Sequence, residues 1–258
     1  MLILLPPSES KASPAGRGRA TDLGRLSFPE LTGTRQQLLA ALATVSSRPD
    51  ALAVLGVGAG LAAEVERNTR LRTLPAAPVA ALYTGVLYDA LGWSTLDAAA
   101  RRRGHASLLV VSALWGALRF GDRVPPYRLS IGTDLPGVGN LAGLWRGVLD
   151  PALSAAAGRG VVVDCRSSSY AAAWRPTGSL AARTVAIRVL REQDGVRTVV
   201  SHLAKHTRGL VARRLLQSAG APRSVEAVAA QLRAEWQVEL LAPARPGQPW
   251  TADLLLTG

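Results

Sequence analysis

The sequence predicts a single α/β domain over residues 1–258, in which a mixed sheet is flanked by helices. Short apolar runs, such as residues 2–5, are typical of buried strands. They alternate along the chain with segments whose apolar residues recur at helical spacing, such as residues 34–46. Asp194-Gly195 lies between two further apolar segments and predicts a β-hairpin. A chain of 258 residues with 48% hydrophobic content allows a sizeable core.

The expected elements follow one another without an internal repeat. The strands are apolar runs that cover residues 2–5, 107–112, 161–165, 184–190, 196–203, 235–242 and 252–256. The expected helices cover residues 34–46, 61–70, 79–91, 95–103, 141–157, 204–218 and 224–234, and helical apolar spacing identifies the first of them. Ser94 and Asp97 form a capping box of the Ser-x-x-Asp kind for the fourth of these helices. Ser224 is a cap for the last one.

The chain shows no targeting or membrane segment. Residues 1–7 lack a basic region and contain two prolines, which excludes a signal peptide. No uninterrupted apolar run reaches the ~20 residues that a membrane helix needs. Cys165 is the one cysteine, which excludes an internal disulfide and a multi-cysteine metal site. We expect a soluble, cytoplasmic protein with no metal and no cofactor, and the sequence does not indicate an oligomeric state.

The net charge of +12 favours polyanionic partners, namely nucleic acid, nucleotides or other phosphorylated molecules. An arginine-rich composition with few acids gives the same charge without any nucleic-acid partner. Only two of the 30 basic residues are lysines, Lys11 and Lys205. An ammonium group is a compact charge whose pKa responds to burial, whereas a guanidinium stays charged. The two lysines are therefore the first candidates for phosphate or carboxylate binding, or for a titrating catalytic group.

Two polar clusters follow apolar strands, where open α/β sheets place ligands. Ser8, Glu9 and Lys11 follow the first strand and offer a hydroxyl, a carboxylate and an ammonium group; a solvated turn is the simpler interpretation. The second cluster follows the strand 161–165 and comprises Ser167, Ser168, Ser169 and Tyr170. Its hydroxyls and backbone amides suit a phosphate or carboxylate, or cap a helix.

A third segment follows the strand 107–112. Pro125-Pro126 fixes an extended backbone and so orients Tyr127 and Arg128. Arg119, Asp122 and Arg128 make either an anion site oriented by a carboxylate or a structural ion pair.

A fourth segment surrounds Lys205. His202 and His206 have the i, i+4 spacing of some zinc sites, but the segment lacks the helical glutamate, and His202 falls in the expected strand. Lys205, His206, Arg208 and Arg213 instead form a basic helix start, which suits phosphate.

One motif bears on nucleic acid. Leu135-Pro-Gly137-Val-Gly139 resembles the hairpin of helix-hairpin-helix elements, in which backbone amides at a glycine turn contact a DNA phosphate. The preceding residues 128–133 read as extended rather than helical, and Pro-Gly is also ordinary turn material.

Six ordered motifs together resemble the YaaA family of peroxide-stress proteins over essentially the whole chain. They are residues 1–11, Tyr83-Thr-Gly85-Val-Leu-Tyr88, Leu114-Trp-Gly116-Ala-Leu-Arg119, Pro126-Tyr127-Arg128-Leu129, Leu144-Trp145 and Ala204-Lys205-x-x-Arg208-Gly209-Leu210. The resemblance implies a compact single-domain α/β fold, a cytoplasmic location, DNA binding through a basic cleft, and a role in limiting iron-driven oxidative damage. It supplies no catalytic mechanism. The Leu-Pro-Gly-Val-Gly segment departs from the family pattern.

Two hypotheses follow. The first is a peroxide-stress protein that binds DNA without sequence preference through Gly137, Gly139, Arg208 and Arg213. The second is an enzyme or binder of a phosphorylated or carboxylated small molecule, with Lys11, Lys205 and Tyr127 as catalytic candidates. We expect Lys11 and Lys205 to lie close in space, with Arg128, Tyr127 and residues 167–170 bordering the same cleft.

Overall fold

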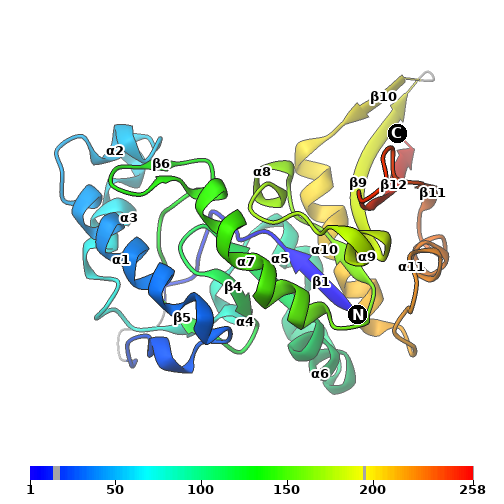
Figure 1. The fold of residues 1–258 in the computed structure, drawn as a ribbon, viewed down its shortest axis with the longest axis horizontal. Helices are drawn as coiled ribbons and strands as arrows, with labels where there is room; N and C mark the ends of the chain where they lie inside the picture. Colours follow the sequence, from blue (N-terminus) through cyan, green and yellow to red (C-terminus); the bar gives the residue numbers. More distant parts are fainter. Residues whose placement is uncertain (14–17, 194–195, 258) are drawn as a thin grey trace.

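An eight-stranded sheet runs through the computed structural model, which describes residues 1–13, 18–193 and 196–257 (Figure 1). Its strands are β1 (Leu2–Leu5), β3 (Leu108–Ser112), β4 (Gly116–Arg119), β8 (Val162–Asp164), β9 (Thr184–Gln193), β10 (Val196–Val199), β11 (Gln237–Leu241) and β12 (Trp250–Thr257). Two small sheets pair β2 (Ala77–Pro78) with β5 (Arg123–Val124), and β6 (Asp134–Leu135) with β7 (Gly139–Asn140). The expected mixed sheet in an α/β domain is confirmed.

The strand order is β11-β12-β9-β8-β1-β3-β4, with β10 paired to β9. The inner pairs β3–β1, β1–β8, β8–β9 and β9–β12 are parallel, whereas β4, β10 and β11 pair antiparallel. From β1 the chain reaches β3 on one side, and it later adds β8 and β9 on the other side. The strand order therefore reverses between β1 and β8, and open α/β sheets bind ligands at the carboxyl ends of strands at such a point.

Helices cover the sheet, and in Figure 1 α7 crosses in front of the central strands. The α-helices are α1 (Thr32–Ser46), α2 (Ala51–Val54), α3 (Ala62–Arg67), α4 (Val79–Leu82), α5 (Val86–Leu91), α6 (Ala98–Ser107), α7 (Leu141–Ala157), α8 (Ser168–Ala171), α9 (Gly178–Ala182), α10 (Ser201–Gln217) and α11 (Val225–Leu232). Short 3-10 turns cover Leu23–Arg25, Pro29–Leu31, Ala59–Leu61, Asn68–Arg70 and Trp93–Thr95. No helix in the described ranges has the length and apolar character to cross a membrane.

Four details of the expected elements were wrong. The helix expected over 79–91 is two short helices, because Gly85 has φ +90° and Tyr83 pairs with Lys11 in an isolated bridge. The next helix begins after Asp97, whose carboxylate accepts from the Ala100 amide, and Ser94 lies in a 3-10 turn instead. α10 begins at Ser201, so the preceding strand ends at Val199. β4 was not expected.

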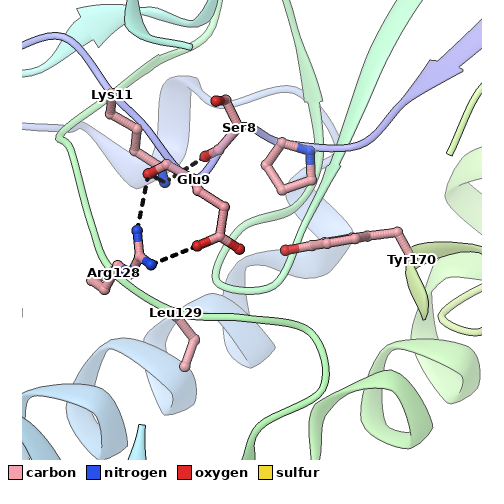
Figure 2. A pocket seen from close by; sticks show the side chains of 7 residues that line it. Ser8, Glu9, Lys11, Arg128, Leu129 and Tyr170 are labelled. Carbon is pink, nitrogen blue, oxygen red and sulfur yellow. Dashed lines mark hydrogen bonds and ion pairs between the residues drawn. The ribbon is translucent and has the colours of Figure 1, made fainter. Parts of the chain in front are cut away.

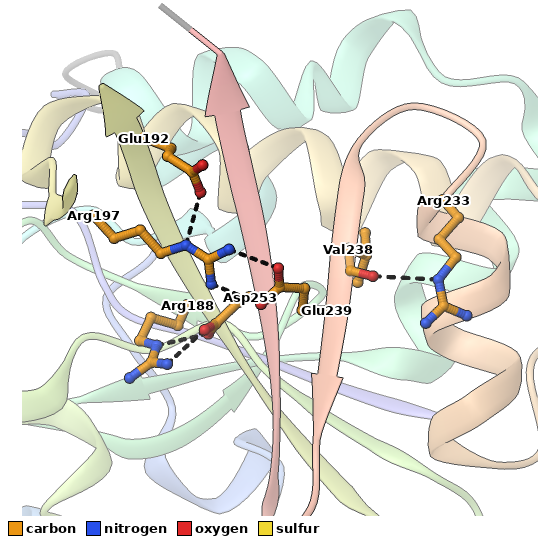
Figure 3. Close-up of polar contacts among 7 residues, drawn as sticks. All are labelled: Arg188, Glu192, Arg197, Arg233, Val238, Glu239 and Asp253. Atoms are coloured by element: carbon orange, nitrogen blue, oxygen red, sulfur yellow. Dashed lines mark hydrogen bonds and ion pairs between the residues drawn. The ribbon is translucent and has the colours of Figure 1, made fainter. Parts of the chain in front are cut away.

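The far part of the sheet carries a row of ion pairs across strands β10, β9, β12 and β11 (Figure 3). Arg188 contacts the carboxylate of Asp253 through two hydrogen bonds of 2.6 and 2.5 Å. Arg197 donates to Glu192 and, through both terminal nitrogens, to Glu239 at 2.7 Å. The pairs follow the strand register, since Arg188 lies opposite Asp253 and Glu192 opposite Arg197. The expected turn at Asp194-Gly195 lies outside the described residues.

Candidate functional site

A pocket lies at the carboxyl ends of the central strands, beside the reversal of strand order. The loop after β1 forms one wall, the extended segment after β5 a second, and α8 after β8 a third (Figure 2). Its lining residues are Pro7, Ser8, Glu9, Lys11, Arg128, Leu129 and Tyr170. The sequence-based expectation that polar segments meet at one edge of the sheet is thus met for three of the four segments.

The Lys11 ammonium group is held at the base of this loop. Its Nζ donates to the backbone oxygens of Ser8 at 2.8 Å and Glu9 at 3.3 Å. It also lies 4.3 Å from the centroid of the Tyr127 ring, a cation–π distance. Burial lowers the pKa of Lys11 to about 8; Glu9 and Glu64 oppose this shift, and Arg128 adds to it.

All four tyrosines of the chain contribute to the site. Tyr83 and Tyr127 lie beneath Lys11, and their hydroxyls are 3.1 Å apart. Tyr88 stacks on Tyr83 with ring centroids 5.3 Å apart and donates a 2.7 Å hydrogen bond to the backbone oxygen of Pro6. Tyr170 lines the open side, and Figure 2 shows it pointing toward Glu9. Burial raises the pKa of each tyrosine, so all four hydroxyls are neutral at physiological pH.

The Tyr127 hydroxyl is fixed from below by the turn that ends β3. It lies 2.7 Å from Ser112 Oγ, which itself accepts from the amides of Leu114 and Trp115. Tyr127 does not line the pocket, but its ring forms the floor beneath Lys11. The structure therefore favours a supporting role for Tyr127 over the direct catalytic role considered from the sequence.

Arg128 brings the second positive charge. Its guanidinium lies 2.6 Å from the Glu9 carboxylate and 3.7 Å from that of Glu64 on α3. Asn68 fixes the backbone of Arg128, accepting from its amide and donating to its carbonyl at 2.9 Å each. The arginine side chain is only 16% exposed, whereas that of Glu9 is 63% exposed. The largely buried cation is thus held in place while its anionic partner borders solvent.

The serine run after β8 contributes less than expected. Ser167 Oγ lies 3.0 Å from Ser169 Oγ, and Ser168 is exposed; of this run only Tyr170 lines the pocket. The run is positioned by the buried Arg166, which pairs with Asp164 at 2.7 Å and donates to the Tyr170 and Trp174 carbonyls. Cys165 beside it is buried, and burial raises the pKa of its thiol to about 12.

Arg119 and Asp122 do not form the expected anion site with Arg128. The Asp122 carboxylate accepts from the amide and hydroxyl of Ser27 and from the Arg119 amide, which ties a turn together. The Arg119 guanidinium donates to the Ala106 carbonyl and lies over the Phe28 ring. Both residues therefore stabilise the fold.

The basic segment of α10 also differs from expectation. Lys205 and His206 are exposed and do not line the pocket. Arg208 donates to the Ile187 carbonyl, and Arg213 donates to the carbonyls of Leu91 and Gly92. These bonds fasten α10 to β9 and to the end of α5.

Gly209 explains another part of the same motif. A Cβ there would lie 2.1 Å from the Leu87 carbonyl oxygen, so only glycine allows α10 to approach α5 this closely. The motif around Lys205 is therefore mainly a packing motif.

The helix-hairpin-helix prediction was wrong. Gly137 and Gly139 have φ of +80° and +90° and form the β6–β7 hairpin, and Asn140 caps the following α7. The residues before β6 are not helical, so the first helix of that element is missing. The described residues contain no cluster of three or more histidine, cysteine or acidic side chains able to hold a metal.

Sequence reasoning missed Glu64, Asn68 and the pair Tyr83 and Tyr88 as parts of the site. The two tyrosines lie within a motif that was recognised, and their spacing places them on either side of Gly85. Nothing in the local sequence distinguishes Glu64 or Asn68 from other polar residues of a solvated helix. Their contacts with Arg128 span at least 60 residues of chain and depend on the tertiary fold.

An open, mostly parallel sheet with a polar pocket beside its point of strand reversal defines the class of α/β protein to which the chain belongs. The chain belongs to the family described as peroxide stress protein YaaA, whose model matches residues 1–239. It is 48% identical over 259 residues to a UPF0246 protein of Streptomyces coelicolor, covering 99% of this chain and 98% of that protein. It is 42% identical over 222 residues to a UPF0246 protein of Corynebacterium efficiens, covering 84% and 86%. The resemblance found in the sequence is confirmed.

Proposed function

We propose that this peroxide stress protein acts in the cytoplasm by binding a small anionic molecule, phosphorylated or carboxylated, in the pocket of Lys11, Arg128 and Tyr170. The observation that carries the proposal is the convergence of a largely buried arginine and a partly desolvated lysine at the reversal of strand order. Burial strengthens the attraction between such cations and an anion, because water screens them less.

Arg128 is the anchor in this proposal. Its guanidinium presents paired donors that match a carboxylate or a phosphate. In the structure the carboxylate of Glu9, which belongs to a loop, takes that place and lies 2.6 Å from the Arg128 guanidinium. Most of the Glu9 side chain is exposed. A ligand anion takes the place of Glu9 while Arg128 stays fixed by Asn68. Tyr170 and Pro7 supply the less polar walls.

The test is a titration with inorganic phosphate at low ionic strength, followed by calorimetry. We expect saturable binding that weakens at least about tenfold in Arg128→Ala, because one charge-assisted contact is lost. Arg102→Ala is the matched control, since Arg102 is exposed on α6 and does not line the pocket, and it leaves binding unchanged. Absence of saturable binding, or equal weakening in both variants, contradicts the proposal.

Duplex DNA is a second candidate partner, favoured by the net charge of +12. The engagement of Arg208 and Arg213 with backbone carbonyls and the missing first helix at Gly137 reduce its structural support. Filter binding at low salt tests it. Retention of DNA, with log affinity falling linearly with log salt by about 0.9 per phosphate contact, supports it. No retention at low salt eliminates it.

A further inference from the structure

Lys11 is the one lysine of the pocket, and the chain contains only one other, Lys205, which is exposed on α10. An amine at such a place has two uses for an anionic ligand. It can remain an ammonium group and pair with the anion, or it can lose a proton and act as a nucleophile. The contacts of Nζ show that the second use is open to Lys11.

Two backbone oxygens, those of Ser8 and Glu9, accept hydrogen bonds from Nζ at 2.8 and 3.3 Å. A neutral amine has two N–H bonds and one lone pair, so these two acceptors satisfy it completely. No carboxylate lies within ion-pair distance of Nζ among the described residues, because Glu9 and Glu64 are paired with Arg128. Deprotonation therefore breaks no salt bridge and leaves a lone pair for a substrate.

The charged groups facing Lys11 act in both directions. Glu9 and Glu64 favour the ammonium form, and Arg128 disfavours it. Tyr83, Tyr127 and Tyr170 are neutral at physiological pH. Burial decides the outcome and lowers the pKa to about 8, so roughly a fifth of the amine is neutral near pH 7.4.

We infer that the Lys11 amine forms an imine with the carbonyl carbon of a small molecule whose anionic group lies at Arg128. This inference rests on the proposed function and narrows its ligand to an aldehyde or ketone that also carries a phosphate or carboxylate. The lining of the pocket supports the pairing, since Lys11 and Arg128 border the same space. Lysines desolvated in this manner form Schiff bases with carbonyl substrates.

The step balances without a further reactant. The ammonium group loses one proton to solvent, and the lone pair of Nζ forms a C–N bond as the carbonyl electron pair moves to oxygen. A proton moves from the nitrogen to this oxygen and gives the carbinolamine, which takes up a further proton on its hydroxyl group and releases water. Loss of the remaining N–H proton gives the neutral imine, so one amine and one carbonyl yield one imine and one water.

The low lysine content makes the test selective. Wild-type protein is incubated at pH 7.5 with pyridoxal 5′-phosphate or, as a smaller probe, glyoxylate, and is then reduced with borohydride. Peptide mass mapping measures labelling at Lys11, at Lys205 and at the α-amino group separately. We expect Lys11 to be labelled at least about tenfold faster than Lys205, because burial lowers the pKa of the Lys11 amine to about 8 and Lys11 borders the pocket of Arg128, which Lys205 does not line. Lys205→Arg retains the labelling, and Lys11→Arg removes it from this peptide.

The outcomes separate the inference from the proposed function. Equal labelling of the two lysines by both probes, or preference for Lys205, overturns the imine. Phosphate binding that depends on Arg128, in a protein that neither probe labels at Lys11, overturns the imine and leaves the anion site standing. Labelling at Lys11 that inorganic phosphate does not slow, and that pyridoxal without its phosphate matches, overturns the anionic part alone.

Discussion

Two arginine–carboxylate pairs in this protein have almost the same length and opposite burial. In Arg128–Glu9, at 2.6 Å, the arginine is 16% exposed and the acid 63%. In Arg188–Asp253, at 2.5 Å, the arginine is 50% exposed and the acid 2%. In the sheet, the strand register holds a buried acid beside its cation. In the pocket, a largely buried cation lies beside an exposed acid. The comparison teaches that two pairs of nearly equal length can differ in which partner the fold holds, and under the proposed function an exposed acid is the partner that a ligand anion replaces.

The largest loss of unfolding free energy is expected for the ion pair in the sheet. Arg188→Ala leaves the buried Asp253 carboxylate without a charge partner, which costs about 3 kcal/mol of unfolding free energy. Urea denaturation at pH 7 measures this loss. The matched control is Arg188→Ala with Asp253→Asn, which removes the unpaired charge and recovers part of the loss. A loss in Arg188→Ala no larger than that in Arg128→Ala ends the proposed contrast between the two pairs.

The pH dependence of the unfolding free energy is expected to reveal the lowered pKa of Lys11. Because the folded-state pKa of about 8 lies below the ordinary value of 10.5, the unfolded chain binds more protons between these two values. Lys11 therefore opposes folding below about pH 8, and this penalty is relieved as the pH rises toward 10.5. Relative to Lys11→Met, wild-type stability rises on the order of 2 kcal/mol across that window, after allowance for partial exposure. Parallel stability curves for the two proteins show that Lys11 titrates normally.

Arg128→Ala is expected to separate function from stability. Both of its acidic partners are at least 37% exposed, so their charges are solvated once the arginine is gone, and unfolding free energy falls by less than about 1 kcal/mol. Phosphate binding falls at least about tenfold in the same variant. Thermal unfolding and calorimetry on one preparation compare the two quantities. If Arg128→Ala unfolds at a clearly lower temperature and binds phosphate normally, Arg128 stabilises the fold and is not the ligand anchor.

The smallest effect is expected at Arg197, whose pairs with Glu192 and Glu239 are exposed on both sides. Arg197→Ala shifts the urea midpoint less than any variant above, and added salt removes the shift. A salt-independent loss comparable to that of Arg188→Ala shows that the row of pairs acts as one unit.

The sequence alone predicted most of the architecture. Apolar runs identified β1, β3 and β8, and helical spacing identified α1, α7 and α10, because these elements bury continuous apolar surface. β4 was missed because it is a hairpin partner of β3 in which Gly116, at φ +68°, interrupts any apolar pattern. The helix over 79–91 was drawn as continuous because local propensity does not reveal the bridge between Lys11 and Tyr83.

Part of the site was also predicted from the pattern of buried strands. Residues that follow parallel strands, such as Lys11 and Tyr170, were placed together because the carboxyl ends of such strands share one edge. Lys205 was included for its rarity, but rarity does not say where a residue lies, and it is exposed on α10. Arg208 and Arg213 were assigned to DNA binding because of their charge. An arginine can equally donate hydrogen bonds to backbone carbonyls, as both do here.

The central claim is that Lys11 is a partly desolvated amine in a ligand pocket, and NMR titration of the protein with ¹³C-labelled lysine side chains tests it directly. The chain gives only two lysine side-chain signals, and Lys205→Arg assigns them. We predict that the Cε signal of Lys11 titrates near pH 8 and that saturating phosphate moves this midpoint upward, because a bound anion favours the ammonium form. A Lys11 midpoint near 10.5, unmoved by phosphate, contradicts the account.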